Sequence, residues 1–375
     1  MQRFANIFHL GIKELRSLWH DKVVLFFVVW ALSGGIYAVA TATSQELHNA
    51  SIAVVDEDRS ELSRRIAGAF YGPYFKTPEL IGVADVDPGM DSGFYSFVLD
   101  IPPDFERDVL ADKLPKIQVN IDATQMTQAF IGAGYIQNIV TGEITEFVQG
   151  YRSEVPLPIK QAVSVKFNPN LTSAWFGSVM EIINNITMLS IILTGAALIR
   201  EREHGTIEHL LVMPLTAFEI MMAKVWAMGL VVLVGAGLSL WLVVQGLLEV
   251  PIAGSVTLFL FGAMLHLFST TSMGIFLGTV ARSMPQFGLL MILILLPLQM
   301  LSGGVTPQES MPEVVQAIMQ FAPTTHFVSF AQAILYRGAG LEVVWPSFLA
   351  IIAIGTAFFL IALTRFRKSI TLTQV

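Results

Sequence analysis

The stretch "LIREREHGTIEHLLVMP" (residues 198–214) lies between two long apolar runs and places seven titratable side chains within ten positions. The whole chain is 54% hydrophobic and only 14% charged. A charged side chain at the centre of a bilayer costs about 2.5–3.5 kcal/mol. This segment must therefore lie in water or against protein, and the composition around it predicts a membrane protein in which it connects two spans.

Six apolar runs predict a polytopic α-helical membrane protein. They occupy residues 23–42, 176–199, 218–247, 255–281, 287–303 and 343–364. Most of them reach the roughly 20 residues that an α-helix needs to cross about 30 Å of hydrocarbon. The fifth run is short and contains Pro297, so we expect its outer end to be broken or re-entrant. Six spans place both termini on the same side of the membrane.

The distribution of lysine and arginine orients these spans. One set of segments, at one end of the apolar runs, carries Arg3, Lys13, Arg16, Lys22, Arg200, Arg202, Lys224, Arg282, Arg365, Arg367 and Lys368, whereas the short opposite segments carry only Arg337. The positive-inside rule makes the first set cytoplasmic. Residues 200–217 and the tail 365–375 are then cytoplasmic. The connection 43–175 is too long for the rule to apply, and it lies on the outer side.

Residues 1–21 predict an amphipathic helix on the inner membrane surface, followed by a first span at 22–42. Apolar side chains recur at helical spacing, and charged residues occupy other positions on the helical wheel. The apolar set is Phe4, Ile7, Phe8, Gly11, Leu15, Leu18 and Trp19, and the charged set is Arg3, Lys13, Glu14 and Arg16. Ala38-Val39-Ala40 resembles a signal-peptide cleavage site, but the long patterned leader favours an uncleaved span.

The connection 43–175 predicts a small α/β domain inserted between spans one and two. Strand patterns at 51–55, 94–99, 116–121 and 161–167 alternate with helical patterns at 60–70, 104–110 and 125–152. Asp104 can cap the second of these helices. Between Ser44 and Trp175 there are 10 Lys/Arg against 18 Asp/Glu. Such acidity is typical of a solvated surface, and a docking face for an external partner is the alternative.

The sequence contains no motif for catalysis by this chain. It lacks the G-x-x-x-x-G-K-[ST] phosphate loop, and it has no cysteine for thiol chemistry or a cysteine-based zinc site. "LSGG" (301–304) resembles the start of the ABC ATPase signature, but it lies at the outer end of a span. His204 and His209 are five residues apart, which is not the spacing of a helical zinc site. We expect neither an enzyme nor a metal site.

Two stretches resemble the permeases of ABC-2 type exporters. "EREHGTIEHLLVMP" (201–214) is similar to the E-R-E-x-G-T-x-E-x-L-L-x-x-P stretch of that family, and "IPPDFERDVLADKLPKIQVNIDAT" (101–124) is similar to a pattern of its drug-export branch. Six spans, an N-terminal surface helix and a large insertion after span one fit the same family. The resemblance covers essentially the whole chain and implies the ABC-2 exporter fold with a periplasmic α/β domain.

The resemblance implies a permease subunit in a bacterial inner membrane that exports amphipathic, drug-like compounds. A separate ABC ATPase would bind ATP and Mg²⁺, so this chain would hold no cofactor itself. The other implied partners are a second permease half, identical or not, and a periplasmic adaptor of the HlyD type, with no nucleic acid. The residues implied to form the ATPase-coupling loop and helix are Arg200, Glu201, Arg202, Glu203, Gly205, Thr206, Glu208, Leu210, Leu211 and Pro214.

The spans themselves give weaker indications of which residues pack together or line a pathway. A polar stripe on one face of the second span consists of Asn184, Thr187, Ser190 and Thr194. Such a stripe either hydrogen-bonds to a neighbouring helix, which is the favoured interpretation, or lines a substrate pathway. Gly274 and Gly278 predict close helix packing. Within spans three to six (218–364), the segment 304–340 carries amphipathic pieces near 312–321 and 327–336 that suit short helices in the outer membrane face.

Two other functions compete with drug export. One is a membrane anchor or receptor whose external domain binds a partner, and the other is an ABC-2 exporter of lipid or polysaccharide. The anchor predicts that residues 200–214 are dispensable, whereas any transport function predicts that they are essential.

Overall fold

The computed structural model describes residues 2–42, 47, 49–122, 124, 126–149, 173–203 and 215–373. The chain divides into two compact units. The first, which we call the helical unit, comprises Met1–Ala42 and Lys166–Val375. The second, which we call the α/β unit, comprises Thr43–Val165.

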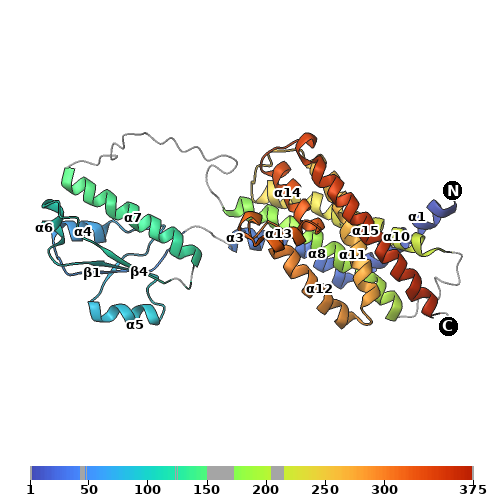
Figure 1. Cartoon of the computed structure of the whole chain (residues 1–375), viewed down its shortest axis with the longest axis horizontal. Coiled ribbons are helices and arrows are strands. Elements are labelled where there is room, and N and C mark those ends of the chain that lie inside the picture. The colour runs from blue at the N-terminus through green and yellow to red at the C-terminus, as the bar shows by residue number, and fades with distance from the viewer. Residues whose placement is uncertain are drawn as a thin grey trace. The chain divides into compact units, whose positions relative to one another are not determined.

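The helical unit confirms a polytopic α-helical membrane protein (Figure 1). Among the described residues, five helical segments are long and apolar enough to cross a membrane, and the 17-residue α12 is an additional, shorter apolar helix. The elements are α1 (Gln2–His20), α2 (Lys22–Ala31), α3 (Gly34–Ala42), α8 (Ser173–Glu203), α10 (Ala217–Ser239) with its π-helical continuation η3 (Leu240–Leu247), α11 (Val256–Val280), α12 (Met284–Met300), the 3₁₀ turn η4 (Gln308–Ser310), α13 (Glu313–Met319), α14 (Pro323–Leu335) and α15 (Leu341–Thr373).

The first apolar run is interrupted between α2 and α3. The Ser33 hydroxyl donates a hydrogen bond to the Val29 carbonyl oxygen at 2.5 Å, and Gly34 and Gly35 follow directly. Serine and glycine together are a common cause of helix kinks, because the hydroxyl competes for a backbone acceptor and glycine adds freedom. Hydropathy alone does not register this break.

The expected break at Pro297 lies slightly later in the chain. α12 continues through Pro297 to Met300, where Leu301 forms its C-terminal cap and donates its N–H to the Pro297 carbonyl oxygen at 2.9 Å. Gly303 follows with a positive φ of 94°, which glycine adopts without steric cost. The chain therefore turns at the Ser302–Gly304 stretch.

The core of the helical unit forms around α11, which packs against α8, α10, α14 and α15. α14 begins with Pro323 in its first turn and buries ten of its side chains. The amphipathic piece expected near 327–336 is therefore an internal helix in this region, because it has apolar contacts on several sides. α13 differs, since Val314 and Ile318 are exposed.

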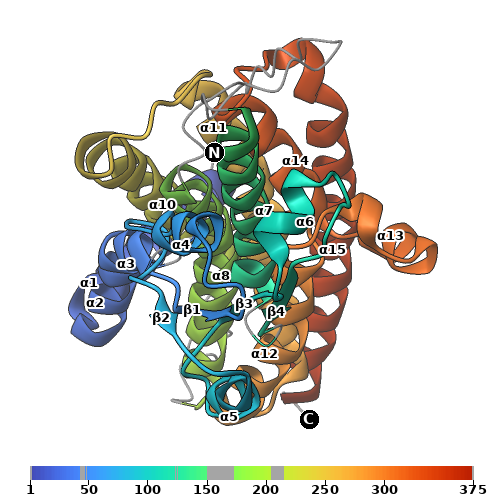
Figure 2. The same ribbon diagram turned by 90° about the vertical axis from the view of Figure 1, so that its left-hand side faces the viewer.

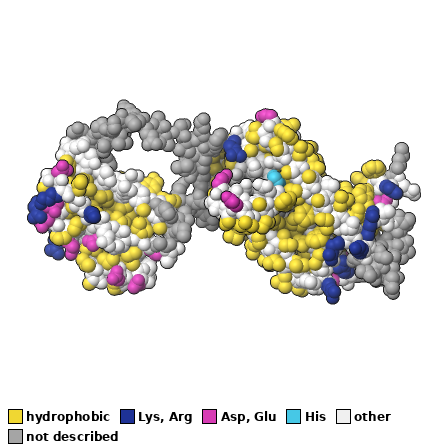
Figure 3. Space-filling model, in the orientation of Figure 1, with side chains coloured by type: hydrophobic (Ala, Val, Ile, Leu, Met, Phe, Trp, Pro, Cys, Tyr) yellow, Lys and Arg dark blue, Asp and Glu magenta, His cyan; other side chains and the backbone are white. Residues whose placement is uncertain are grey.

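The surface of the helical unit is largely apolar, and lysine and arginine side chains gather at the end where both chain termini lie (Figures 1 and 3). On α12, large exposed apolar side chains include Leu289 and Leu293. A surface of this kind suits hydrocarbon rather than water.

The α/β unit is built on a four-stranded sheet in the order β2-β1-β3-β4. The strands are β1 (Ile52–Asp56), β2 (Glu79–Leu80), β3 (Phe97–Ile101) and β4 (Gln118–Ile121). β1 runs parallel to β2 and β3, whereas β3 and β4 are antiparallel. β1 and β3 are almost wholly buried, as expected of central strands covered on both faces.

Helices cover both faces of this sheet (Figure 2). α4 (Glu61–Gly68), α6 (Phe105–Leu110) and α7 (Met126–Gln149) lie on one face, and α5 (Val86–Asp91), preceded by η1 (Val83–Asp85), lies on the other. The strand expected at 161–167 lies outside the described residues.

The aspartate that caps α6 is not the predicted Asp104 but Asp58. Asp104 has a left-handed φ of 60° and makes no side-chain capping bond; its carboxylate pairs instead with Arg107 at 3.0 Å. The Glu106 N–H at the start of α6 donates to the Asp58 Oδ2 at 3.0 Å. The cap comes from a residue distant in sequence, so local spacing could not identify it.

Candidate functional site

Four consecutive charged residues at the end of α8 each reach a different neighbour. Arg200 pairs with Asp21 at 2.6 Å, between α1 and α2. Arg202 donates to the Ala281 carbonyl oxygen at 2.7 Å, at the end of α11. Glu203 accepts from the Met284 N–H at 2.9 Å, at the start of α12. The charged end of α8 is therefore bonded to several other helices, at the ends that the sequence predicts to be cytoplasmic.

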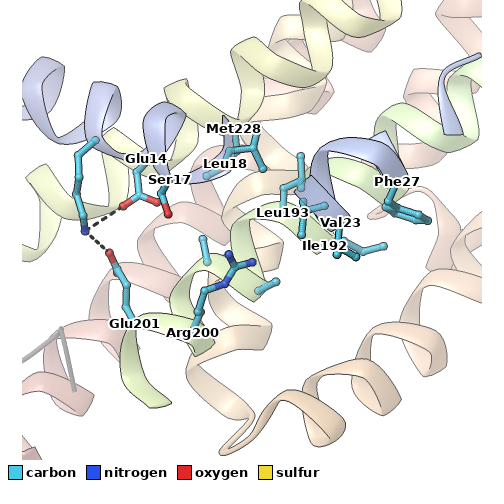
Figure 4. Close-up of a pocket in the computed structure, with 14 residues that line it drawn as sticks. Glu14, Ser17, Leu18, Val23, Phe27, Ile192, Leu193, Arg200, Glu201 and Met228 are labelled. Atoms are coloured by element: carbon cyan, nitrogen blue, oxygen red, sulfur yellow. Dashed lines mark hydrogen bonds and ion pairs between the residues drawn. The ribbon is translucent and has the colours of Figure 1, made fainter. Parts of the chain in front are cut away.

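The fourth residue, Glu201, belongs to a buried ionic cluster. Its carboxylate lies 2.8 Å from the Lys13 ammonium of α1 and 2.7 Å from the Lys224 ammonium of α10. Lys224 also pairs with Glu14 of α1 at 3.0 Å. Figure 4 shows the Glu14 and Glu201 side chains converging, with Arg200 beside Glu201. We call Lys13, Glu14, Glu201 and Lys224 the ionic cluster.

The ionic cluster is mostly hidden from solvent. The exposed fractions of Lys224, Glu14 and Glu201 are 1%, 6% and 9%. Burying a charge is costly unless an opposite charge pairs with it. Here two cations and two carboxylates balance, with Lys13 half-exposed at the edge, so the cluster joins α1, α8 and α10 and carries no net charge as a whole.

Close packing joins α1 to α10 beside the cluster. A Cβ atom on Gly11 would lie only 2.0 Å from the Trp226 ring, so only glycine fits without movement of that ring. The Trp226 Nε1–H donates to the Ile7 carbonyl oxygen at 3.1 Å, and its ring stacks on Phe8. Asn6 donates to Glu219 at 3.1 Å. α1 is therefore fixed along α10.

The described residues of the expected coupling loop differ in burial. Glu201 is buried and faces into the unit, whereas Glu203 is exposed. Six of the sequence-predicted residues lie outside the described residues, and their roles stay predictions: Gly205, Thr206, Glu208, Leu210, Leu211 and Pro214. After this segment α10 begins with a capping box, in which Thr216 and Glu219 bond reciprocally.

The polar stripe of α8 faces α11. Thr187 Oγ1 lies 2.9 Å from His266 Nε2, and the Ser190 hydroxyl donates to Thr270 Oγ1 at 2.6 Å. Thr194 donates to the Ser190 carbonyl oxygen. These contacts favour the helix-packing interpretation, and a pathway role stays a prediction. Asn184 is only half-buried, and its carbonyl oxygen accepts from Gln299 at 3.4 Å.

Gly274 and Gly278 lie where α11 crosses α8. A Cβ atom on Gly274 would lie 2.6 Å from the Ile191 carbonyl oxygen, and one on Gly278 would lie 3.1 Å from the Leu198 side chain. The absence of side chains at these two positions allows the close approach of the helices, as expected of such motifs.

Sequence reasoning missed several buried polar residues, among them Glu14, Lys224 and His266. Glu14 and Lys224 were grouped with surface charges, and His266, which is fully buried and stacked on Phe327, was not singled out. A signal existed for two of them, because Lys224 and His266 lie within apolar runs, where titratable groups are costly. Their partners are too distant in sequence to be predicted.

The chain matches the family model described as "ABC-2 family transporter protein" over residues 23–364. The chain belongs to the ABC-2 transporter family. It is therefore a multi-pass membrane permease of that family, as the resemblance of the 201–214 stretch predicted.

Curated relatives match the permease along nearly its whole length. It is 62% identical over 370 residues to the inner membrane transport permease YhhJ of Escherichia coli (strain K12), with 99% of each chain covered. It is 28% identical over 372 residues to the probable multidrug ABC transporter permease YbhR of the same organism, covering 98% of this chain and 100% of that protein. The probable multidrug permease YbhS is 28% identical over 341 residues, with 88% of each chain covered.

Proposed function

We propose that the permease is the membrane-spanning half of an ATP-driven exporter of amphipathic small molecules in the bacterial inner membrane. A separate ABC ATPase hydrolyses ATP and pushes on the charged end of α8 and on residues 204–214. The observation that carries the proposal is the attachment of this end: Glu201 to α1 and α10, Arg202 to α11, and Glu203 to α12. A force applied there reaches several spans together.

The substrate class rests on family names and on the character of the membrane unit. Two relatives carry the word multidrug in their names, at 28% identity. A pathway that opens between apolar helices suits molecules with both apolar and polar parts. A second permease half completes the pathway, and an adaptor of the HlyD type docks on the α/β unit, which lies in the periplasm.

The proposal is tested by purifying the tagged permease from its native cells and identifying the proteins that accompany it. We expect an ABC ATPase in the complex and increased drug susceptibility in cells that lack the permease. A permease that copurifies with no ATPase, and whose loss leaves susceptibility and envelope lipids unchanged, would favour the anchor function. Changed envelope lipids with unchanged drug susceptibility would favour lipid export.

Reversing the charge of Glu203 is expected to weaken ATPase copurification while leaving the permease inserted. Glu203 is exposed, so a Glu203→Lys change presents an unfavourable charge to the partner, and its cost to the fold is limited to the hydrogen bond that Glu203 accepts from the Met284 N–H. The measurement is the ratio of ATPase to permease after affinity purification. Glu313→Lys, an exposed glutamate at the start of α13, is the matched control. Equal ratios in wild type and Glu203→Lys would contradict a contact at this residue.

The orientation is tested by labelling single cysteines with an impermeant thiol reagent in cells with a permeabilised outer membrane. The chain has no native cysteine, so each label reports one site. We expect Thr124→Cys in the α/β unit to react and Thr206→Cys and Thr371→Cys to stay unlabelled until the inner membrane is opened. Labelling of Thr371→Cys before Thr124→Cys would invert the proposed topology.

A further inference from the structure

A cavity of about 500 Å³ lies beside the ionic cluster, between α1, α2, α8 and α10 (Figure 4). One part of its wall is apolar and includes Val23, Phe27 and Leu193. The other part is polar and includes Lys13 and Arg200. Its volume falls within the roughly 300–1,000 Å³ of small-molecule sites. Its lining has an apolar part and a polar part, as an amphiphilic molecule has.

The polar part of the cavity presents its cations more openly than its carboxylates. The side chains of Lys13 and Arg200 are 49% and 35% exposed, whereas those of Glu14 and Glu201 are 8% and 10% exposed. Both carboxylates are held by the buried Lys224 ammonium. A ligand that enters the cavity therefore meets the Lys13 ammonium, which also pairs with Glu201, and the Arg200 guanidinium, which also pairs with Asp21. Both kinds of cation bind phosphate and carboxylate oxygens.

The position of the cavity also suits a ligand with an anionic head. It lies at the end of the helical unit where lysine and arginine gather (Figure 3), and its apolar wall continues along α2 and α8 into the apolar part of the unit. Anionic headgroups of a membrane leaflet meet basic residues at this level, while acyl chains lie deeper.

We propose that this cavity binds an anionic amphiphile, with its phosphate or carboxylate head between Lys13 and Arg200 and its hydrocarbon along Val23, Phe27 and Leu193. The occupant is an anionic phospholipid of the leaflet or a drug-sized anion of the same build. Because the cavity is lined by α1, α2 and α8 together, its occupant also strengthens the attachment of α1. The proposal concerns binding and does not depend on the transport function.

The test measures binding to the full-length permease in detergent by native mass spectrometry, without nucleotide or ATPase. The probes are phosphatidylglycerol, phosphatidylcholine and dodecyl phosphate. We expect the permease to retain the anionic probes about tenfold more tightly than phosphatidylcholine, which a single charge-assisted contact can provide. Tighter binding of phosphatidylglycerol than of dodecyl phosphate identifies the lipid as the occupant, and the reverse identifies a single-chain anion.

Two variants on the same helix separate the cavity from the outer surface. Val23 lines the cavity and is 78% exposed, whereas Val29 is 58% exposed and does not line it. Val23→Trp fills the cavity mouth and should lower anionic-probe affinity about tenfold, while Val29→Trp should leave it unchanged. Lys13→Gln should lower the affinity and Lys13→Arg should preserve it. Equal retention of phosphatidylglycerol and phosphatidylcholine, or equal effects of the two tryptophans, would overturn the proposal.

Discussion

A Lys224→Ala permease should lose about 3–5 kcal/mol of stability, the usual consequence of removing one partner from a buried ion pair. The Lys224 ammonium lies 3.0 Å from Glu14 and 2.7 Å from Glu201, and its side chain is only 2% exposed. Alanine leaves two buried carboxylates facing the single remaining cation, Lys13. The measurement is thermal unfolding of the purified permease in detergent, together with its abundance in the membrane.

Two further variants show whether burial causes the loss. Lys13→Ala removes a cation whose side chain is 49% exposed, so we expect a smaller loss of about 0–1 kcal/mol. Combining Lys224→Met with Glu14→Leu replaces one buried pair by apolar groups and leaves Glu201 with Lys13, so most of the stability should return. If Lys224→Ala unfolds at the wild-type temperature, the ionic cluster does not hold the three helices together.

Hydropathy predicted the membrane body well because the core of a water-soluble domain does not require apolar runs of this length. The runs at 176–199 and 255–281 correspond closely to α8 and α11. The break between α2 and α3 was missed, because it depends on one hydroxyl and two glycines within a run that remains apolar. The internal position of α14 was missed for a related reason: hydropathy does not distinguish an apolar side chain against lipid from one against protein.

The sequence indicated where in the chain the candidate site lies, but not which side chains contact one another there. The density of charge at 200–203 identified the end of α8 from sequence. Glu201 was grouped with its charged neighbours, yet it is buried between Lys13 and Lys224. These partners come from other helices, and the packing of those helices cannot be inferred from a single sequence. The spacing of Gly11, Glu14 and Leu18 did contain a signal, since these residues share one helical face and are the buried residues of α1.

The described residues that flank 204–214 make defined contacts on both sides. Before it, α8 ends at Glu203 with the charged contacts described above. After it, Thr216 and Glu219 bond reciprocally at the start of α10, with the Thr216 N–H donating to Glu219 at 2.7 Å. Glu201 and Lys224 join these two helices directly. Coupling requires a contact that differs between two states of the partner, and this segment is the proposed place for it.

Replacing Leu210 and Leu211 together by alanine should abolish drug-stimulated ATP hydrolysis while leaving membrane abundance normal. The two leucines are proposed to enter an apolar groove of the ATPase, and truncating a fully buried leucine removes about 2–5 kcal/mol for each side chain. That loss is a large part of a moderate binding energy, so the ATPase would still hydrolyse ATP but would no longer respond to drug. The measurement is ATPase activity of the reconstituted complex with and without drug, beside immunoblots of the membrane fraction.

The matched control removes the hydroxyls of the α8 stripe by Thr187→Val, Ser190→Ala and Thr194→Val. These side chains are buried against α11 or within α8, nine or more residues before Glu203 at the end of α8. Their loss should change which compounds stimulate hydrolysis more than the extent of stimulation, because packing between α8 and α11 affects the shape of the membrane body. If the leucine variant kept full stimulation while the stripe variant lost it, the coupling contact would lie in the membrane helices, and residues 204–214 would only connect them.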